Sequence, residues 1–152
     1  MDFYDYLQKN AKDDKIDNVV VGAIITNSKD EIFLAKRRVE DFMGGLYEIP
    51  SGKTKNNEKL YEALLREVKE ETNLNVIKVN SYIDQFDYLS SSCKKCRQFN
   101  FNVEVDDKQI LLTEHDSYKW AKLEDIANED EISPEVKKVL LTYIYNQNQM
   151  KI

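Results

Sequence analysis

Residues 52–74, GKTKNNEKLYEALLREVKEETNL, combine a helical pattern of apolar residues with charged residues at fixed spacing. From Glu58 onward the segment consists mainly of strong helix formers, and Asn56 or Asn57 is available to cap the helix N-terminus. The apolar positions that recur at helical spacing are Leu60, Ala63, Leu64 and Val68. The stretch therefore predicts a helix that begins near residue 58 and buries one side.

Three glutamates complicate this apolar stripe. When residues are placed at 100° each, Glu67 and Glu71 fall inside the stripe and Glu70 flanks it. A carboxylate that faces a core is costly to desolvate unless a positive group meets it. Carboxylates at positions i, i+3 and i+4 can converge on a hard divalent cation such as Mg²⁺. A solvated Glu-rich helix is the alternative in a chain with 33% charged residues, but the placement of the acids favours a metal site.

This stretch resembles the signature motif of the Nudix hydrolases. The matching positions are Gly52, Glu58, Arg66, Glu67, Val68, Glu70, Glu71 and Leu74. One position departs, because the family usually has Gly where this chain has Asn73, directly after the helix. Asn is the most tolerant residue after Gly of the left-handed conformation that a helix end often requires. The departure is therefore expected to cost little, and it touches no carboxylate.

The resemblance implies a metal-dependent hydrolase. Nudix hydrolases cleave the diphosphate bond of a nucleoside diphosphate linked to another group, and they use Mg²⁺, with Mn²⁺ as a substitute. Water that attacks a diphosphate needs cations, which neutralise the substrate and lower the pKa of the water. The metal ligands implied in this chain are Glu67, Glu70, Glu71 and the backbone carbonyl of Gly52.

Further catalytic roles follow from the same resemblance. Arg66 is expected to orient the carboxylates by ion pairs, and Glu58 lies further round the helix, where it would support the ligands without binding metal. The acid that accepts a proton from water is Glu67, Glu70 or Glu114, because family members use different acids for this step. For Glu114 the alternative is an ordinary exposed loop acid.

Arg37 is the candidate for binding substrate phosphate. It ends a predicted strand, and many Nudix enzymes place an arginine at this distance before the motif. A planar guanidinium suits a diphosphate, although an arginine at a strand end is often simply solvated. Arg38 is the second choice. Tyr47 and Phe42 are candidates for the border of a base pocket, with ordinary packing as the alternative.

Length and composition narrow the class of protein. A chain of 152 residues with 41% hydrophobic residues fits one domain, spanning residues 1–152. The net charge of −6 argues against polymeric nucleic acid as a partner and leaves a small phosphorylated nucleotide. The sequence has no apolar run long enough for a signal peptide or a membrane span, so we expect a cytoplasmic protein. Its oligomeric state is not indicated.

The remaining sequence alternates strand and helix patterns. Residues 18–26 are apolar on both faces and predict a buried strand, whereas 99–105 alternate with a period of two. Other strands are predicted at 31–36, 74–79, 82–88 and 117–121, helices at 123–126 and from Ser133-Pro134 onward, and a short helical or irregular lead-in at 2–10. The resemblance implies an α/β (α+β) Nudix fold, with a mixed β-sheet sandwiched between helices.

Cys93 and Cys96 occupy the predicted turn between strands 82–88 and 99–105. Their CxxC spacing occurs in zinc and redox sites, but zinc would need two further ligands, and His115 in an apparently exposed loop is a poor candidate. We interpret the pair as reduced surface thiols, with an adventitious metal or a disulfide as the alternative. On the same strands, Tyr82, Phe86 and Tyr88 are predicted to share one face.

The substrate is less sharply indicated than the chemistry. The short chain, the lead-in YEIPSGK and Trp120 are most similar to the MutT-type group of the family, which implies an ordinary or oxidised nucleoside triphosphate and a nucleoside monophosphate product. The alternatives are ADP-ribose or another nucleotide sugar, a non-catalytic nucleotide-binding module, and isopentenyl diphosphate isomerisation. The binding module is disfavoured because all motif carboxylates are present, and the isomerase needs an active-site cysteine.

Overall fold

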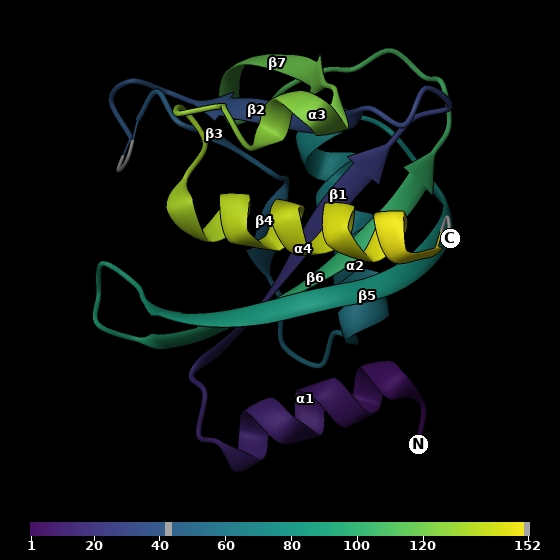
Figure 1. The fold of residues 1–152 in the computed structure, drawn as a ribbon. Helices are drawn as coiled ribbons and strands as arrows, with labels where there is room; N and C mark the ends of the chain where they lie inside the picture. Colours follow the sequence, from purple (N-terminus) through teal and green to yellow (C-terminus); the bar gives the residue numbers. More distant parts are fainter. Residues whose placement is uncertain (42–43, 151–152) are drawn as a thin grey trace.

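In the computed structural model of the protein, residues 1–41 and 44–150 are described. Their centre is a seven-stranded mixed sheet with the order β3-β2-β1-β6-β5, in which β4 also pairs with β1 and β7 with β2. The strands are β1 Asn18–Thr26, β2 Ile32–Arg37, β3 Tyr47–Glu48, β4 Ser51–Lys53, β5 Val76–Leu89, β6 Lys95–Val105 and β7 His115–Ala121. Figure 1 shows the long β5–β6 hairpin extending beyond the rest of the sheet.

Helices cover both faces of this sheet (Figure 1). On one face α2 (Leu60–Thr72) and α1 (Phe3–Asp13) share a core with Phe99, Phe101 and Val103 of β6. On the other face α4 (Pro134–Met150) and α3 (Leu123–Ile126) enclose a second core. The arrangement confirms the predicted mixed sheet between helices. Among the described residues, no helix is long and apolar enough to cross a membrane.

The centre of the sheet is a parallel pair of strands. β1 runs beside β6 from Asn18 opposite Cys96 to Thr26 opposite Glu104. Because this pair has a core on each side, β1 is apolar on both faces, as its sequence predicts. In β6 the alternating polar residues are buried as well, with Asn100 at 0% and Asn102 at 2% exposure. The period of two there separates two interior faces rather than a core face from a solvent face.

Strand β5 differs from its prediction. It is one strand from Val76 to Leu89, whereas the sequence predicts two, and its register against β6 shifts at three places. One shift lies between Tyr82 and Asp84 and turns the later residues over. Tyr82 therefore packs in the α2-side core, while Phe86 packs in the α4-side core. The prediction that Tyr82, Phe86 and Tyr88 share a face is wrong.

The two ends of α2 test the sequence in different ways. The helix begins at Leu60, and its N-cap position is Lys59, so neither Asn56 nor Asn57 caps it as predicted. Asn57 instead takes a left-handed turn conformation with φ 62°. At the other end Asn73 has φ 72° and donates its N–H to the carbonyl of Lys69, which is the predicted left-handed cap.

Candidate active site

Arg66 lies at the centre of the charged residues of α2. Its Nε and Nη2 donate to the two oxygens of Glu58 at 2.7 and 2.9 Å. Its Nη1 donates to Glu67 at 2.7 Å and to Glu70 at 3.0 Å, and Nη2 also reaches the carbonyl of Lys53. The hydrogen bonds from Arg66 hold the pKa of Glu58 below its ordinary value. The guanidinium therefore occupies the orienting position that the sequence predicts for it.

Glu71 is the buried acid of the helix. Its exposed fraction is 4%, and its Oε2 is buried without a hydrogen-bond partner. Burial raises its pKa to about 10, and the nearby carboxylates of Glu67, Glu114 and Glu48 push in the same direction, against a hydrogen bond from the backbone of Ser51. A buried carboxyl with one unpartnered oxygen among three other acids is an unfavourable arrangement that a cation would relieve.

Glu67 lies between Glu71 and Arg66 and directly against Gly52. Desolvation raises the pKa of Glu67, while its hydrogen bond to Arg66 opposes this shift. A Cβ built on Gly52 would overlap the Glu67 carboxylate. Any side chain at position 52 would therefore displace this acid, and glycine is the residue that lets the β4 backbone approach it.

The glutamates do not already enclose a metal position in this conformation. Within residues 1–41 and 44–150, no group of three His, Cys, Asp or Glu side chains surrounds a common point. Glu67 and Glu70 turn towards Arg66, and the Glu70 side chain is 51% exposed. The predicted convergence of Glu67, Glu70 and Glu71 is thus incomplete here. The donors are nevertheless oxygens only, around an orphaned buried carboxyl, and this set fits a hard divalent cation.

Glu114 lies in the loop before β7, on the exposed surface. The loop is fastened to its surroundings by Thr113, whose Oγ1 donates to the carbonyl of Glu70 at 3.0 Å. Arg38 donates to the Thr113 carbonyl at 2.8 Å, so this second-choice arginine holds the loop. Glu114 comes close enough to raise the pKa of both Glu67 and Glu71. The structure therefore brings this acid to the α2 carboxylates.

Glu48 and His115 belong to the same cluster, and sequence reasoning missed both. His115 Nε2 lies 2.9 Å from Glu48 Oε1, and Arg37 Nη1 donates to Glu48 Oε2 at 3.1 Å. His115 is 8% exposed because β7 begins at this residue, so its interpretation as an exposed loop residue is wrong. Strand pairing brings the two residues together, because Glu48 of β3 pairs with Ala35 of β2 and His115 of β7 pairs with Arg37 of β2.

A pocket of about 290 Å³ adjoins this cluster. Its apolar walls are Ile49, Phe86, Tyr88, Leu89 and Val136, and its polar lining consists of Arg37, Glu48, Ser51, Gln98, Ser133 and Glu135. Of the predicted base-pocket residues, Tyr47 is not in this lining, and its ring packs under the Lys119 ammonium at 4.3 Å. Phe42 lies outside the described residues. The sequence therefore named Arg37, which lines this pocket, and missed the apolar walls, while a role of Arg37 in binding phosphate stays a prediction.

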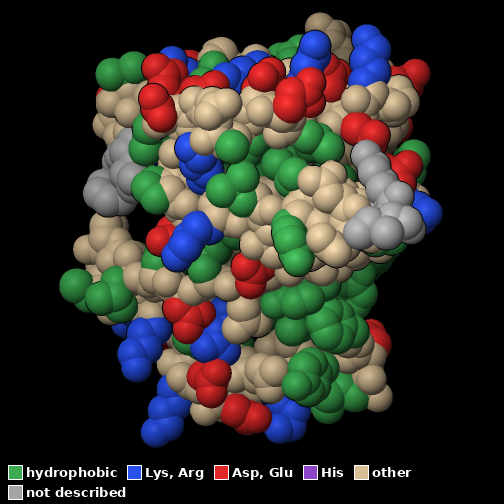
Figure 2. All heavy atoms as spheres, in the orientation of Figure 1, with side chains coloured by type: hydrophobic (Ala, Val, Ile, Leu, Met, Phe, Trp, Pro, Cys, Tyr) green, Lys and Arg blue, Asp and Glu red, His purple; other side chains and the backbone are tan. Residues whose placement is uncertain are grey.

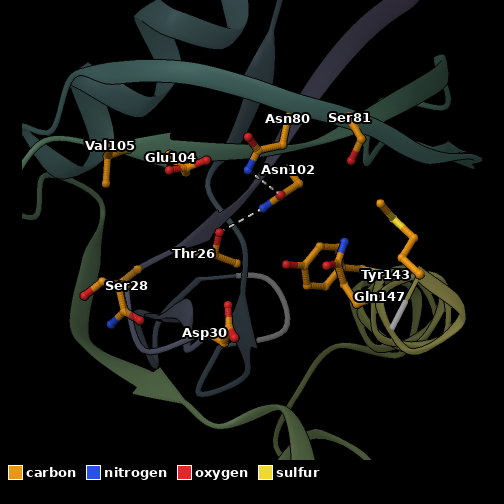
Figure 3. Close-up of a pocket in the computed structure, with 12 residues that line it drawn as sticks. Thr26, Ser28, Asp30, Asn80, Ser81, Asn102, Glu104, Val105, Tyr143 and Gln147 are labelled. Carbon is orange, nitrogen blue, oxygen red and sulfur yellow. Dashed lines mark hydrogen bonds between the residues drawn. The ribbon is translucent and has the colours of Figure 1, made fainter. Parts of the chain in front are cut away.

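A second pocket, of about 570 Å³, lies at the C-terminal end of β1, where Thr26 is part of its lining (Figure 3). Its polar groups bind one another, because Asn80 donates to Asn102 at 2.9 Å and Asn102 donates to Thr26 at 3.1 Å. Asp30 and Glu104 add negative charge, and the described lining contains no Lys or Arg. This second pocket is therefore ill suited to a diphosphate.

The two cysteines lie away from the carboxylates. Both cysteines are free thiols, and Cys93 is exposed in the hairpin turn, but Cys96 is buried in β6, so its interpretation as a surface thiol is wrong. Among the described residues neither joins a metal-binding group.

Figure 2 shows the face that carries α4, where basic and acidic side chains are intermixed.

Comparison with known proteins identifies the family of the chain. The NUDIX domain family matches residues 17–143. An 8-oxo-dGTP diphosphatase of Buchnera aphidicola subsp. Schizaphis graminum is 32% identical over 112 residues, which cover 74% of this chain and 82% of the relative. The crystal structure of a MutT protein from Methanosarcina mazei Go1 matches with TM-score 0.75 and 26% identity, covering 87% of this chain and 95% of that one.

A further solved structure is MutT from Aliivibrio salmonicida and Vibrio cholerae, which is 30% identical at TM-score 0.64 and covers 82% of this chain and 97% of that one. The chain belongs to the Nudix family. Within it the chain is a nucleotide pyrophosphohydrolase, which confirms the predicted fold and enzyme class. Membership implies dependence on a divalent metal and a small nucleotide substrate.

Proposed function

We propose that the protein hydrolyses a nucleoside triphosphate to a nucleoside monophosphate with Mg²⁺ as its cofactor. The observation that carries this proposal is the buried Glu71 carboxyl, whose Oε2 has no hydrogen-bond partner, beside Glu67, Glu48 and Glu114 and next to a pocket with apolar walls. A bound divalent cation would neutralise the diphosphate and lower the pKa of the attacking water. Mn²⁺ prefers similar oxygen ligands and is expected to substitute.

The metal ligands in this proposal are Glu67, Glu70, Glu71 and the Gly52 carbonyl. Glu67 and Glu70 would turn from Arg66 towards the cation, and Arg66 would keep their carboxylates oriented from behind. This exchange is reasonable because Arg66 retains its two bonds to Glu58 throughout. The absence of a Cβ at position 52 keeps the backbone next to the cation ligands.

The proton of the attacking water is assigned to one of Glu67, Glu70 and Glu114. Glu67 and Glu70 are held by Arg66, whereas Glu114 is exposed and reaches the other acids only electrostatically. All three therefore stay candidates for the base. Single Gln substitutions compared by their pH–rate profiles would separate them, because removal of the base removes the lower limb of the profile.

Substrate is expected to extend from the carboxylates into the 290 Å³ pocket. Arg37 stands at the junction and would bind phosphate, exchanging its contact with Glu48 for a phosphate oxygen. The base would lie against Phe86 and Tyr88, whose rings can stack on it. A pocket of this size is near the lower end of small-molecule sites, which suits a single nucleoside.

Oxidised dGTP is our leading substrate, since two relatives carry the name 8-oxo-dGTP diphosphatase. ADP-ribose and other nucleotide sugars are the second choice. The test is hydrolysis of 8-oxo-dGTP, the ordinary nucleoside triphosphates and ADP-ribose with Mg²⁺, Mn²⁺ or EDTA, followed by pyrophosphate and monophosphate release. Metal-dependent release of pyrophosphate from a triphosphate is expected. Cleavage of ADP-ribose alone, or activity that survives EDTA, would contradict the proposal. Cytoplasmic location stays a prediction.

A further inference from the structure

Helix α1 precedes the region that matches the family, yet it contacts the start of the metal-binding helix. The family match begins at residue 17, and α1 ends at Asp13. Leu7 and Ala11 of α1 are buried in the core that also contains Leu60. Tyr4 packs edge-on against Tyr61, with ring centroids 5.4 Å apart. These contacts fix α1 beside the first turn of α2.

Gln8 makes two hydrogen bonds across this contact. The backbone N–H of Leu60 donates to Gln8 Oε1 at 3.1 Å, and Gln8 Nε2 donates to the carbonyl of Glu58 at 3.2 Å. The first N–H groups of a helix have no partner within the helix and need an outside acceptor. Lys59 at the N-cap position makes no side-chain cap. Glu62 of the motif accepts the backbone N–H of Lys59 at 3.0 Å, and Gln8 supplies, from another helix, the acceptor for the next N–H, that of Leu60.

The backbone that Gln8 holds leads directly to the metal ligands. Glu58 receives the backbone N–H of Lys55 at 2.9 Å and the two bonds from Arg66. Arg66 in turn contacts Glu67 and Glu70. One continuous hydrogen-bonded path thus runs from the side chain of Gln8 through Glu58 and Arg66 to two carboxylates of the site.

We propose that Gln8 is a positioning residue for the divalent-cation site, which it orders by holding the backbone at Glu58 and Leu60. The inference rests on the proposed metal-dependent function, in which Glu67 and Glu70 are ligands. Loss of the two bonds lets the first turn of α2 fray, and the anchor of Arg66 moves with it. The affinity for the cation then falls, while the chemistry at saturating cation changes less.

Two substitutions separate the two bonds. Gln8→Met keeps the length of the side chain and removes both bonds. Gln8→Glu keeps an acceptor for Leu60, where a negative charge also suits the helix N-terminus, and loses the donor to Glu58. Mn²⁺ binding is measured directly by the loss of the free-ion electron paramagnetic resonance signal, and nucleotide hydrolysis is measured against Mg²⁺ concentration.

Gln8→Met is expected to weaken Mn²⁺ binding by about 3- to 10-fold, which is the size of a lost helix cap, and to raise the half-saturating Mg²⁺ concentration by a similar factor. The kcat at saturating Mg²⁺ should stay within about 2-fold of the wild-type value. Gln8→Glu should recover most of the Mn²⁺ affinity, because the bond to Leu60 is restored. A merely structural role would not give this order.

Asp2→Ala is the matched control for stability. Asp2 caps α1 itself, since the N–H of Asp5 donates to its Oδ1 at 2.8 Å, whereas the side chain of Gln8 bonds to the start of α2. Its loss should lower stability as much as Gln8→Met does and leave Mn²⁺ affinity unchanged. Equal Mn²⁺ affinity in Gln8→Met and wild type, or an equal loss in Asp2→Ala, overturns the proposal. If the wild-type protein binds no Mn²⁺, Gln8 has no such role. Mn²⁺ binding without nucleotide hydrolysis contradicts the proposed function alone.

Discussion

The two helices on opposite faces of the sheet bury very different side chains. The inward residues of α4 are Val136, Val139, Leu140 and Tyr143. Those of α2 include aliphatic residues of the same kind, and in addition the acid Glu71. Tyr143 is the polar exception on α4, and burial raises the pKa of its phenol, so it stays neutral at pH 7. Glu71 differs because at its ordinary pKa of 4.5 it would be ionised at pH 7, and it is burial that raises this pKa to about 10.

This difference separates what stabilises the fold from what performs the chemistry. An apolar face gains free energy on burial, whereas a carboxyl in the same position costs free energy until a cation reaches it. The face of α2 is therefore worse as a packing surface than that of α4. A residue that weakens the free protein and fits a metal is expected at a functional site. Substitutions on the two helices should accordingly give opposite patterns of stability and activity.

The largest effect is expected from the carboxylates of α2. Glu71→Gln and Glu70→Gln should each lower kcat by about three orders of magnitude, because a neutral amide is a poor ligand for a hard cation. The fold should persist, since each change is nearly isosteric. Steady-state hydrolysis of the best triphosphate, with circular dichroism as the check on folding, measures this. Rates close to wild type in both variants would remove Glu70 and Glu71 from the metal site.

A large change of the opposite kind is expected on α4. Leu140→Ala should lower the free energy of unfolding by about 2–5 kcal/mol, because this side chain is fully buried and leaves a cavity. The activity of the folded fraction should not change, since Leu140 does not line the proposed substrate pocket. Urea denaturation and active-site-normalised rates test this.

Leu141 provides the control on the same helix. It is 40% exposed, so Leu141→Ala should change stability by no more than about 0.5 kcal/mol. If Leu140→Ala and Leu141→Ala destabilised equally, the assignment of the inward face of α4 would be wrong. A fall in kcat of the folded Leu140→Ala protein would instead link α4 to the catalytic step.

The pH dependence of stability should reveal Glu71 in the metal-free protein. Its folded pKa of about 10 lies above the ordinary 4.5, so the folded state binds more protons between these values. Stability should therefore fall as pH rises from about 5.5 to 9 in EDTA, by at most about 1.4 kcal/mol per pH unit. Denaturant titrations at several pH values measure the slope.

Two comparisons sharpen this experiment. Glu71→Gln should show a flatter profile, because the titrating group is gone, and Mg²⁺ should flatten the wild-type profile by binding the ionised form. Glu58 and Asp87 do not interfere, since arginine contacts lower the pKa of each and their contributions are lost only at more acidic pH, whereas Glu67, whose pKa desolvation raises, contributes in the same direction as Glu71. Wild-type stability that rises across this window would show that Glu71 is not the dominant group.

The smallest effect on activity is expected from substitutions in the β5–β6 hairpin, which lies outside the two helices compared above. The double change Cys93→Ser, Cys96→Ser should leave kcat/KM and metal content unaltered. Cys96 is 1% exposed, so its replacement should cost about 1 kcal/mol of stability, whereas Cys93→Ser alone should cost less than about 0.5 kcal/mol. A marked loss of activity or of bound metal would show that the CxxC pair has a function.

The same contrast explains what the sequence could predict. Local patterns predict helix α2, the buried strand 18–26 and the proline-initiated α4. The structure confirms the positions of all three. The placement of Glu71 inside an apolar stripe was also readable, because helical periodicity alone puts it there. Local patterns also predict the left-handed conformation of Asn73 at the end of α2, because it depends on the conformational freedom of that one residue.

Features made by distant segments were not readable. Glu48 and His115 meet only because β3 and β7 both pair with β2, and no spacing in the sequence records this. The bulge in β5 inverts half of a strand without any Gly or Pro to mark it. Gln8 caps α2 from another helix, and the residues next to the start of α2, such as Asn56 and Asn57, carry no sign of this contact. Tertiary contacts decide each of these.

The parallel pairing of β1 with β6 has a consequence for how the chain folds. Asn18 lies beside Cys96, a partner 78 positions away, so the middle of the sheet closes only after a long segment has been brought together. Pairings of this range are slow because their loop entropy is lost before contacts compensate it, whereas the β5–β6 hairpin can form locally. Gly52 pairs with Val21 of that same late strand. The proposed metal site at Gly52 and the α2 glutamates should thus assemble among the last events in refolding. Recovery of activity should lag behind formation of the hairpin.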